Sequence, residues 1–263
     1  MSAMKTKFEK KRLDLILFEL GYFDSKNKAQ ANILAQNVKI DGVLVKKAGE
    51  MFDFGSFIDP VNPRRVEIAS MPFVSRGGLK LQRAILEFGI DLTDRLCIDI
   101  GASTGGFTDC MLQYGAQKVW AVDVGYNQLD WKLRTDERVV VVEKTNVKIC
   151  SAEDIFADYR GEMPSFLCMD LSFISVKKVL KNIKNFISEN AELVLLIKPQ
   201  FEAGREDVEK GGVVRDENVH RNIIADIETF SASIGLEPRG ITASPIQGSK
   251  SGNVEYLMYL RRK

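Results

Sequence analysis

The sequence is poor in the residues that build metal and disulfide sites. It contains a single histidine, His220, and four cysteines that never form a C-x-x-C pair. One histidine cannot form a metal cluster, and scattered cysteines in apolar segments are typical of reduced core thiols. We therefore expect neither a metal site nor a disulfide bond.

Long hydrophobic runs are also missing. The apolar stretches, such as residues 193–197, have the length of strands, whereas a membrane-spanning helix needs ~18 apolar residues. The first twelve residues, MSAMKTKFEKKR, are charged, and no apolar core of a secretion signal follows them. Hydrophobic residues at 45% and charged residues at 28% are typical of a globular chain. These features predict a folded cytoplasmic protein that makes no contact with a membrane.

Positive charge is concentrated at the start of the chain. The first fifty residues hold ten Lys and Arg against six Asp and Glu, although the net charge of the whole chain is only +1. Apolar spacing predicts helices over 10–20 and 26–36, and the Asp41-Gly42 pair between two apolar triplets predicts a tight hairpin. We expect a small α+β domain over 1–66 and a proline-containing linker over 67–72.

Strands and helices alternate through the remaining residues, 73–263. Strands are predicted at 96–100, 118–122, 139–143, 166–169, 193–197 and 254–259, with helices between them such as 108–114 and 176–187. This alternation indicates a second domain of the α/β class, with a mostly parallel, Rossmann-like sheet covered by helices on both faces.

A turn rich in small residues follows the first of these strands. The segment CIDIGASTGGFT, residues 97–108, passes from an apolar strand to a helix, and Asp123 ends the next strand 22 residues after Gly101. Glycines at this place let the backbone approach a nucleoside cofactor, and a carboxylate one strand later can accept hydrogen bonds from ribose hydroxyls. The candidate cofactor-binding residues are Asp99, Gly101, Ser103, Gly105, Gly106, Phe107 and Asp123.

Two cofactors fit this spacing. A nicotinamide dinucleotide prefers G-x-G-x-x-G, which places a pyrophosphate at the helix N-terminus. Here Ser103 replaces the second glycine, and Asp99 precedes the turn. Both features favour S-adenosylmethionine, because its cationic amino acid end requires nearby anions, and they leave the dinucleotide as the second alternative.

Four charged residues interrupt or end apolar runs elsewhere in this domain. They are Lys80 in a short predicted helix, Asp170 and Lys198 at the ends of strands, and Glu255 in a late strand. Taken alone, each of these charges could be explained as a side chain exposed to solvent at the end of a strand. Asp170 and Lys198, however, both leave the carboxyl ends of central strands, the edge that also carries the glycine turn, so we expect them to meet there.

Several segments together resemble the TlyA (haemolysin A) family, which joins an S4 RNA-binding domain to an FtsJ-like methyltransferase domain. The resemblance covers nearly the whole chain. Its most specific segments are VSRGGLKL at 74–81, DIGASTGGFTD at 99–109, IKPQFEAGRE at 197–206, KGGVVRD at 210–216 and GNVEYL at 252–257. It implies a 2′-O-methyltransferase that acts on the ribose of cytidine in ribosomal RNA, with ribosomal subunits as partners and S-adenosylmethionine as cofactor.

The resemblance also implies roles for the four charged residues. The FtsJ-like pattern Lys-Asp-Lys-Glu corresponds to Lys80, Asp170, Lys198 and Glu255. A ribose 2′-hydroxyl is a poor nucleophile at neutral pH, so a base must take its proton. Lys198 is the expected base, Asp170 would position its amine or the hydroxyl, and Glu255 would orient Lys80.

Basic side chains of both domains are candidates for RNA contacts. In an S4-like domain the lysines of the second helix and the hairpin would contact phosphates and RNA shape. The segment 202–216 is rich in glycine and charge, and we interpret it as a loop at the border of the site. The expected RNA-binding residues are Lys26, Lys28, Lys39, Lys46, Lys47, Arg205, Lys210 and Arg215.

Two further function classes remain open. The chain could be a non-catalytic RNA-binding or ribosome-assembly factor, which the complete Lys-Asp-Lys-Glu set disfavours. It could also be a pore-forming haemolysin, as the family's traditional name suggests. The sequence contains neither a spanning helix nor a long series of amphipathic barrel strands, and these lacks disfavour a pore.

Overall fold

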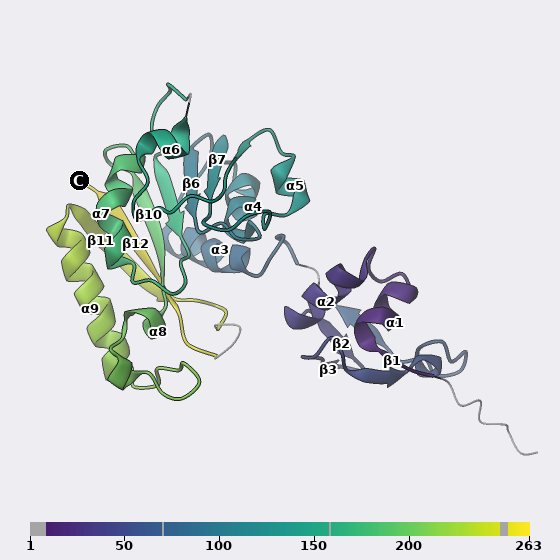
Figure 1. The fold of residues 1–263 in the computed structure, drawn as a ribbon. Coiled ribbons are helices and arrows are strands. Elements are labelled where there is room, and N and C mark those ends of the chain that lie inside the picture. The colour runs from purple at the N-terminus through teal and green to yellow at the C-terminus, as the bar shows by residue number, and fades with distance from the viewer. Residues whose placement is uncertain (1–8, 70, 158, 248–251) are drawn as a thin grey trace, which may run out of the picture. The chain divides into compact units, whose positions relative to one another are not determined.

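In a computed structural model the chain forms two compact units, Met1–Pro72 and Phe73–Lys263 (Figure 1). The structure describes residues 9–69, 71–157, 159–247 and 252–263. Each unit has its own hydrophobic core, so each is described by itself.

The first unit packs two helices against short strands. Its core contains Leu13, Ile16 and Leu17 of the first helix, with Ala29 and Ile33 of the second. The elements are α1 (Leu13–Glu19) and α2 (Lys26–Leu34), a three-stranded sheet in the order β3 (Val43–Leu44), β2 (Val38–Ile40), β5 (Val66–Ile68), a ribbon of β1 (Lys10–Arg12) with β4 (Met51–Asp53), and the 3-10 helix η1 (Phe54–Phe57).

The predicted hairpin lies where the sequence places it. Asp41 and Gly42 both have positive φ, +52° and +79°, as a two-residue turn that follows the right-handed twist of its strands requires. Ser25 begins α2, as its sequence position suggests, because its hydroxyl accepts a hydrogen bond from the Lys28 backbone N–H.

Two boundaries in this unit differ from the sequence prediction. Residues 10–12 form β1, paired antiparallel with Met51–Asp53, so the helix expected over 10–20 begins only at Leu13. Residues 67 and 68, expected in the linker, belong to β5, which pairs with β2. In both places, pairing with a strand distant in the chain overrides the local apolar spacing.

The second unit contains a seven-stranded sheet in the order β11-β12-β10-β9-β6-β7-β8. Neighbouring strands from β10 to β8 run parallel, whereas β12 is antiparallel to both β10 and β11. This is the mostly parallel α/β sheet that the sequence predicts. Its strands are β6 (Leu96–Ile100), β7 (Lys118–Val122), β8 (Val139–Val142), β9 (Phe166–Met169), β10 (Glu192–Ile197), β11 (Leu236–Ala243) and β12 (Tyr256–Arg262).

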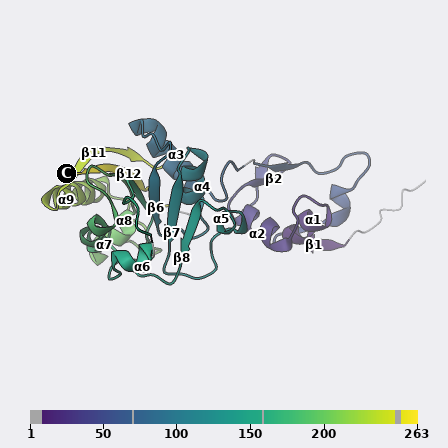
Figure 2. The same cartoon turned by 90° about the horizontal axis from the view of Figure 1, so that it is seen from above.

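Helices cover both faces of this sheet, and Figure 2 shows α3 and α4 on one side with α6 and α7 on the other. Alternate residues of a strand enter different cores: in β6, Ile98 packs towards α7 while Cys97 packs towards α3 and α4. The helices are α3 (Gly77–Phe88), α4 (Gly106–Gln113), α5 (Trp131–Arg134), α6 (Ala152–Phe156), α7 (Lys177–Ile183), α8 (Pro199–Glu202) and α9 (Glu217–Ser233), with 3-10 turns η2 (Lys184–Phe186) and η3 (Arg205–Asp207).

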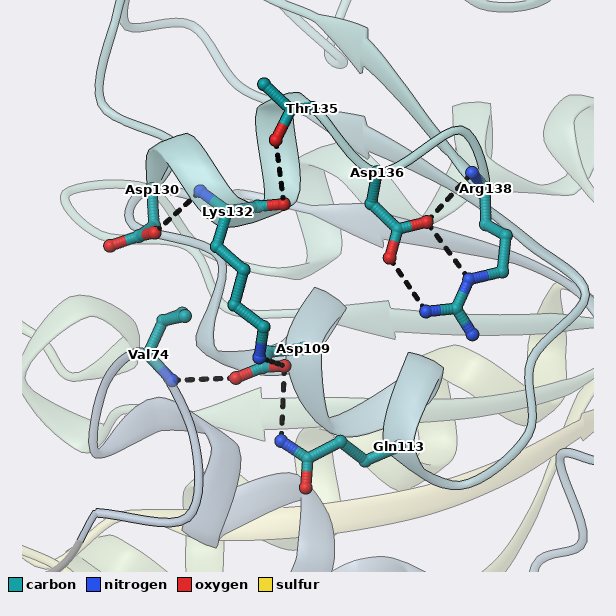
Figure 3. A network of polar contacts seen from close by, with 8 residues as sticks. All are labelled: Val74, Asp109, Gln113, Asp130, Lys132, Thr135, Asp136 and Arg138. Carbon is teal, nitrogen blue, oxygen red and sulfur yellow. Dashed lines mark hydrogen bonds and ion pairs between the residues drawn. The ribbon is translucent and has the colours of Figure 1, made fainter.

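A buried carboxylate fixes the first residues of this unit. Asp109 of α4 accepts hydrogen bonds from the Val74 backbone N–H at 2.8 Å and from the Lys132 ammonium at 3.2 Å (Figure 3). The Gln113 side chain donates to it as well. The segment that enters the domain is therefore tied to the helix that follows the glycine turn.

Cys97, Cys110 and Cys168 are buried thiols, and Cys150 is partly exposed and also free. In the ranges given above, no group of three or more His, Cys, Asp or Glu side chains is placed to hold a metal ion. The helices of those same ranges are each too short or too polar to cross a bilayer.

Candidate active site

Strand register brings together three of the four charged residues selected from the sequence. Asp170 follows β9 and Lys198 follows β10, and these two parallel strands are hydrogen-bonded neighbours. Glu255 precedes β12, whose first residue Tyr256 pairs with Ile197 at the end of β10. The carboxyl ends of β9 and β10 and the start of β12 thus meet at one edge of the sheet.

The four side chains form one chain of ion pairs at this edge. Lys80 of α3 reaches Glu255 with 2.5 Å between Nζ and Oε2, and it lies 4.0 Å from Oδ2 of Asp170. The other oxygen of Asp170, Oδ1, pairs with the ammonium of Lys198. Two cations and two anions therefore alternate in the order Glu255, Lys80, Asp170, Lys198.

Exposure decreases along this network from Asp170 to Glu255. The Asp170 side chain is 23% exposed, that of Lys80 is 13% exposed and that of Glu255 is 3% exposed. A buried carboxylate is tolerated only when it is paired, and Lys80 provides the partner of Glu255. Asp170 is the most exposed member of the network, and it pairs with Lys198, which is 11% exposed.

The structure adds a serine that sequence reasoning missed. The ammonium of Lys198 donates a hydrogen bond to Ser172 Oγ at 3.0 Å. Ser172 is exposed and lies two residues after Asp170. The sequence offered only its closeness to Asp170 in the segment that follows β9.

Glycines of the predicted cofactor turn allow it to touch the charged network. Gly101 has φ +84°, and a Cβ atom on it would lie 2.3 Å from the backbone oxygen of Asp170. At Gly106 a Cβ atom would lie 2.3 Å from Ser75 Oγ, just before α3. A ligand cradled by this turn would therefore lie beside both Asp170 and the helix that carries Lys80.

Asp123 closes the turn from the neighbouring strand. One of its carboxylate oxygens accepts the Ser103 backbone N–H at 2.8 Å, and the other accepts the Gly125 N–H at 2.6 Å. Asp123 is only partly buried, so its oxygens remain open to further donors. This is the arrangement that a ribose-binding carboxylate requires.

Two of the expected cofactor residues point into the protein instead. Asp99 has no exposed surface: it accepts a hydrogen bond from Thr108 Oγ1 at 2.6 Å, and burial raises the pKa of its carboxyl to about 7. Phe107 is 4% exposed and packs in the core beside α3. Both lie beneath the turn, where they would support it from below.

The loop between α8 and α9 is hydrogen-bonded to the segment just before Glu255. Asn253 accepts a hydrogen bond from Val214 N and donates one to Gly212 O. The ring of His220 forms two hydrogen bonds of 2.9 Å, one between Nε2 and Val214 O and one between Nδ1 and the phenol oxygen Oη of Tyr256. His220 thus has a structural role, as a lone histidine suggested.

The expected RNA-contacting side chains lie on the surface of their own units. Arg215 pairs with Glu209 at 2.9 Å, and Lys28 pairs with Asp24 at 2.6 Å. Exposed pairs of this kind are weak and can be exchanged for phosphate contacts. The exposed basic residues are Lys26, Lys28, Lys39, Lys46 and Lys47 in the first unit and Arg205, Lys210 and Arg215 in the second.

Comparison with known proteins gives both units a family. Residues 73–262 match the FtsJ-like methyltransferase family, and residues 11–58 match the S4 domain. The chain is 44% identical over 252 residues to "Putative rRNA methyltransferase YqxC" of Bacillus subtilis, covering 96% of this chain and 86% of that protein. It is 40% identical to "16S/23S rRNA (cytidine-2'-O)-methyltransferase TlyA" of Mycobacterium tuberculosis, covering 95% and 89%.

A solved structure matches along most of the chain as well. It is titled "Putative hemolysin from Streptococcus thermophilus", with a TM-score of 0.73 and 38% identity. The match covers 97% of this chain and 89% of the other.

Proposed function

The chain belongs to the TlyA family, in which an S4 domain precedes an FtsJ-like methyltransferase domain, and from this membership and its site we propose the following reaction. The protein transfers a methyl group from S-adenosylmethionine to the 2′-oxygen of a cytidine ribose in ribosomal RNA. A ribosomal RNA substrate places the reaction in the cytoplasm.

One observation carries this proposal. A lysine, Lys198, lies at the carboxyl edge of the sheet, paired with Asp170, and the backbone of Asp170 touches the glycine turn at Gly101. A base, its charged partner and the glycine turn are thus adjacent. A transfer reaction needs this proximity because placing the two reactants together accounts for much of its rate.

The residues of the turn fit the proposed cofactor. Gly101 lets the backbone of the turn lie against Asp170, and Asp123 offers carboxylate oxygens to ribose hydroxyls. Asp99 would support the turn from beneath through its hydrogen bond with Thr108. When bound, S-adenosylmethionine supplies an electrophilic methyl group, and the electron pair of the broken C–S bond remains on sulfur.

Within this chain, Lys198 acts as the general base. Its amine, once deprotonated, takes the proton of the 2′-hydroxyl, so that the oxygen can form its bond to the methyl carbon. Asp170 holds the amine and stabilises the ammonium that results from the proton transfer. Lys80 and Glu255 complete the network. The Lys80 ammonium lies between the carboxylates of Asp170 and Glu255 and reduces the repulsion between their charges.

RNA recognition is assigned to the basic side chains of both domains. The lysines of α2, β2 and the segment after β3 are exposed, as are the basic residues of the loop before α9. Contacts of these groups with phosphates would position the RNA without reading its sequence. We assign the first contact to the S4 domain and the approach to the site to Arg205, Lys210 and Arg215.

The proposal is tested by methylating isolated ribosomal subunits with S-adenosylmethionine labelled in its methyl group. We expect label in ribosomal RNA at a cytidine 2′-oxygen, located by the resistance of that linkage to alkaline hydrolysis. Leakage of a dye from liposomes is measured in parallel with the same protein. Leakage without any RNA label would favour the haemolysin reading and contradict the proposal.

A further inference from the structure

The amine of Lys198 has two partners, and only one belongs to the Lys-Asp-Lys-Glu pattern. Its Nζ pairs with Asp170 Oδ1 and also donates a hydrogen bond to Ser172 Oγ at 3.0 Å. Ser172 is exposed, so this contact is not a consequence of burial. The contact between this exposed hydroxyl and a nearly buried lysine therefore needs another explanation.

The geometry of a neutral amine explains what a second hydrogen-bond partner can do. A deprotonated lysine has two N–H bonds and one lone pair, arranged tetrahedrally, and it rotates freely about its last C–N bond. A single hydrogen-bond acceptor fixes only one N–H bond. The amine can still rotate about that bond, so the direction of its lone pair is not defined. Two acceptors fix both N–H bonds and direct the lone pair into the one remaining direction.

The segment around Ser172 contacts the segment that carries Lys198. Phe173, which follows Ser172, has φ +65°, a conformation that is uncommon for a bulky side chain. Its ring packs against Phe201, three residues after Lys198, with 5.0 Å between the ring centroids. This contact joins the segment that carries Ser172 to the segment that carries Lys198.

A second contact joins the same two segments. Glu202 of α8 accepts a hydrogen bond from the Val176 backbone N–H at 2.8 Å, just before α7. Two contacts therefore connect the segment of Asp170 and Ser172 to the segment of Lys198. Catalytic groups need such support, because small errors in orientation reduce the rate strongly.

We infer that Ser172 is a positioning residue for the base: together with Asp170 it fixes the Lys198 amine so that the lone pair faces the substrate hydroxyl. This inference rests on the proposed methyl transfer. The hydroxyl proton moves from the ribose oxygen to the Lys198 lone pair, while Ser172 keeps its own proton and only accepts a hydrogen bond. Its role is orientation, and it undergoes no chemical change.

The test compares Ser172→Ala with Ser172→Thr, which retains a hydroxyl. In steady-state methylation of ribosomal subunits we expect Ser172→Ala to lower kcat by about 5- to 30-fold, a part of what a positioned base contributes. KM for both substrates should stay within about twofold, because Ser172 orients the base rather than binding the substrates. Ser172→Thr should recover most of kcat.

A control serine lies far from the site in the chain. Ser233 at the end of α9 is exposed, and its hydroxyl donates to Phe230 O. Ser233→Ala should leave both kcat and KM at the parent values. If Ser172→Ala also turns over at the parent rate, the inference is wrong.

A second measurement does not depend on activity. Trace acylation of lysines in the cofactor-free protein by acetic anhydride, quantified by mass spectrometry, reports the reactivity of each amine. Ser172→Ala should change the labelling of Lys198 relative to exposed Lys178 by at least about twofold, because the amine loses a hydrogen-bond partner. Ser233→Ala should not change this ratio.

The two measurements separate the possible failures. If the parent protein methylates RNA but neither kcat nor the labelling ratio responds to Ser172→Ala, the positioning inference fails and the proposed function stands. If the parent transfers no methyl group although the labelling ratio responds, the proposed function fails while the Ser172 contact to the amine stands.

Discussion

The Nζ of Lys80 lies 2.5 Å from a carboxylate oxygen of Glu255, although 175 residues separate the two in the chain. Helix α3 precedes the whole sheet, and Glu255 precedes its last strand, so this contact exists only in the completed domain. Because Glu255 is almost fully buried, this ion pair contributes to the stability of the domain as well as to the arrangement of the site.

Breaking this pair should destabilise the domain. Glu255→Ala leaves the Lys80 ammonium without its nearest partner, and removing one member of a buried ion pair costs about 3–5 kcal/mol. Urea unfolding of Glu255→Ala, Lys80→Ala and the double variant gives the coupling energy of the pair. The same cycle on the exposed pair of Arg83 and Glu87, with Arg83→Ala, Glu87→Ala and the double variant, should give a coupling energy below about 1 kcal/mol. A coupling energy no larger than that of Arg83–Glu87 would contradict this prediction.

Removing the proposed base should abolish methyl transfer while cofactor binding survives. Lys198→Ala should lower kcat by about 10³-fold, within the usual range for a general base. Calorimetry should give an affinity for S-adenosylmethionine near that of the parent. Lys178→Ala, which removes an exposed lysine of α7, serves as the matched control. Equal turnover by Lys198→Ala and the parent would refute the assignment.

The glycine turn offers a matched pair of substitutions. Gly101 and Gly89 both have positive φ, but a Cβ atom at Gly101 would lie 2.3 Å from Asp170 O, whereas Gly89 has nothing within 4 Å. Gly89→Ala should cost only the backbone strain of about 1 kcal/mol. Gly101→Ala must also displace backbone at the site, so it should lower both stability and affinity for S-adenosylmethionine. Similar behaviour of the two variants in thermal melts and calorimetry would contradict the close contact.

Asp99 should make stability depend on pH. Burial raises the pKa of its carboxyl from 3.8 in the unfolded chain to about 7. Between these values the native state binds more protons than the unfolded state, so stability falls as pH rises and the loss is complete above about pH 7. The full difference corresponds to roughly 4 kcal/mol.

Asp99→Asn should remove this slope, since the amide is neutral at every pH. Urea unfolding of the cofactor-free protein at pH 5 and pH 8 measures it, with Asp94→Asn at an exposed position as the control. The parent and Asp94→Asn should lose stability between the two pH values by more than Asp99→Asn does. If the free energy of unfolding changes equally with pH in all three proteins, the Asp99 carboxyl does not have a raised pKa in the native state.

RNA binding should depend on salt through the lysines of the S4 domain. Each phosphate contact that is lost reduces the slope of log K against log salt by about one. Lys46→Ala with Lys47→Ala should therefore weaken binding to ribosomal RNA and flatten this slope, as measured by filter binding from 50 to 200 mM salt. Lys148→Ala removes an exposed lysine of the other domain and should leave the slope unchanged. Binding that is independent of salt would count against the S4 surface.

Much of the fold was readable from the chain because it depends on local patterns. Strands β6, β7 and β9 begin and end at the residues that the sequence predicts, since a strand buried on both faces is a continuous apolar run. The Asp41-Gly42 turn and the start of α9 after Asp216 follow from the conformations that their own residues favour. β11 was missed, because its proline and glycine interrupt the apolar alternation at a bulge between Pro238 and Gly240.

The sequence by itself determined that strands carry Asp170 and Lys198 to the same edge as the glycine turn, because parallel strands end on one side of a sheet. Only the tertiary structure decided which charges pair, because contact depends on strand order and register rather than on spacing in the chain. Register placed Glu255 beside the end of β10, packing turned Asp99 and Phe107 inward, and the fold set Ser172 against the amine of Lys198.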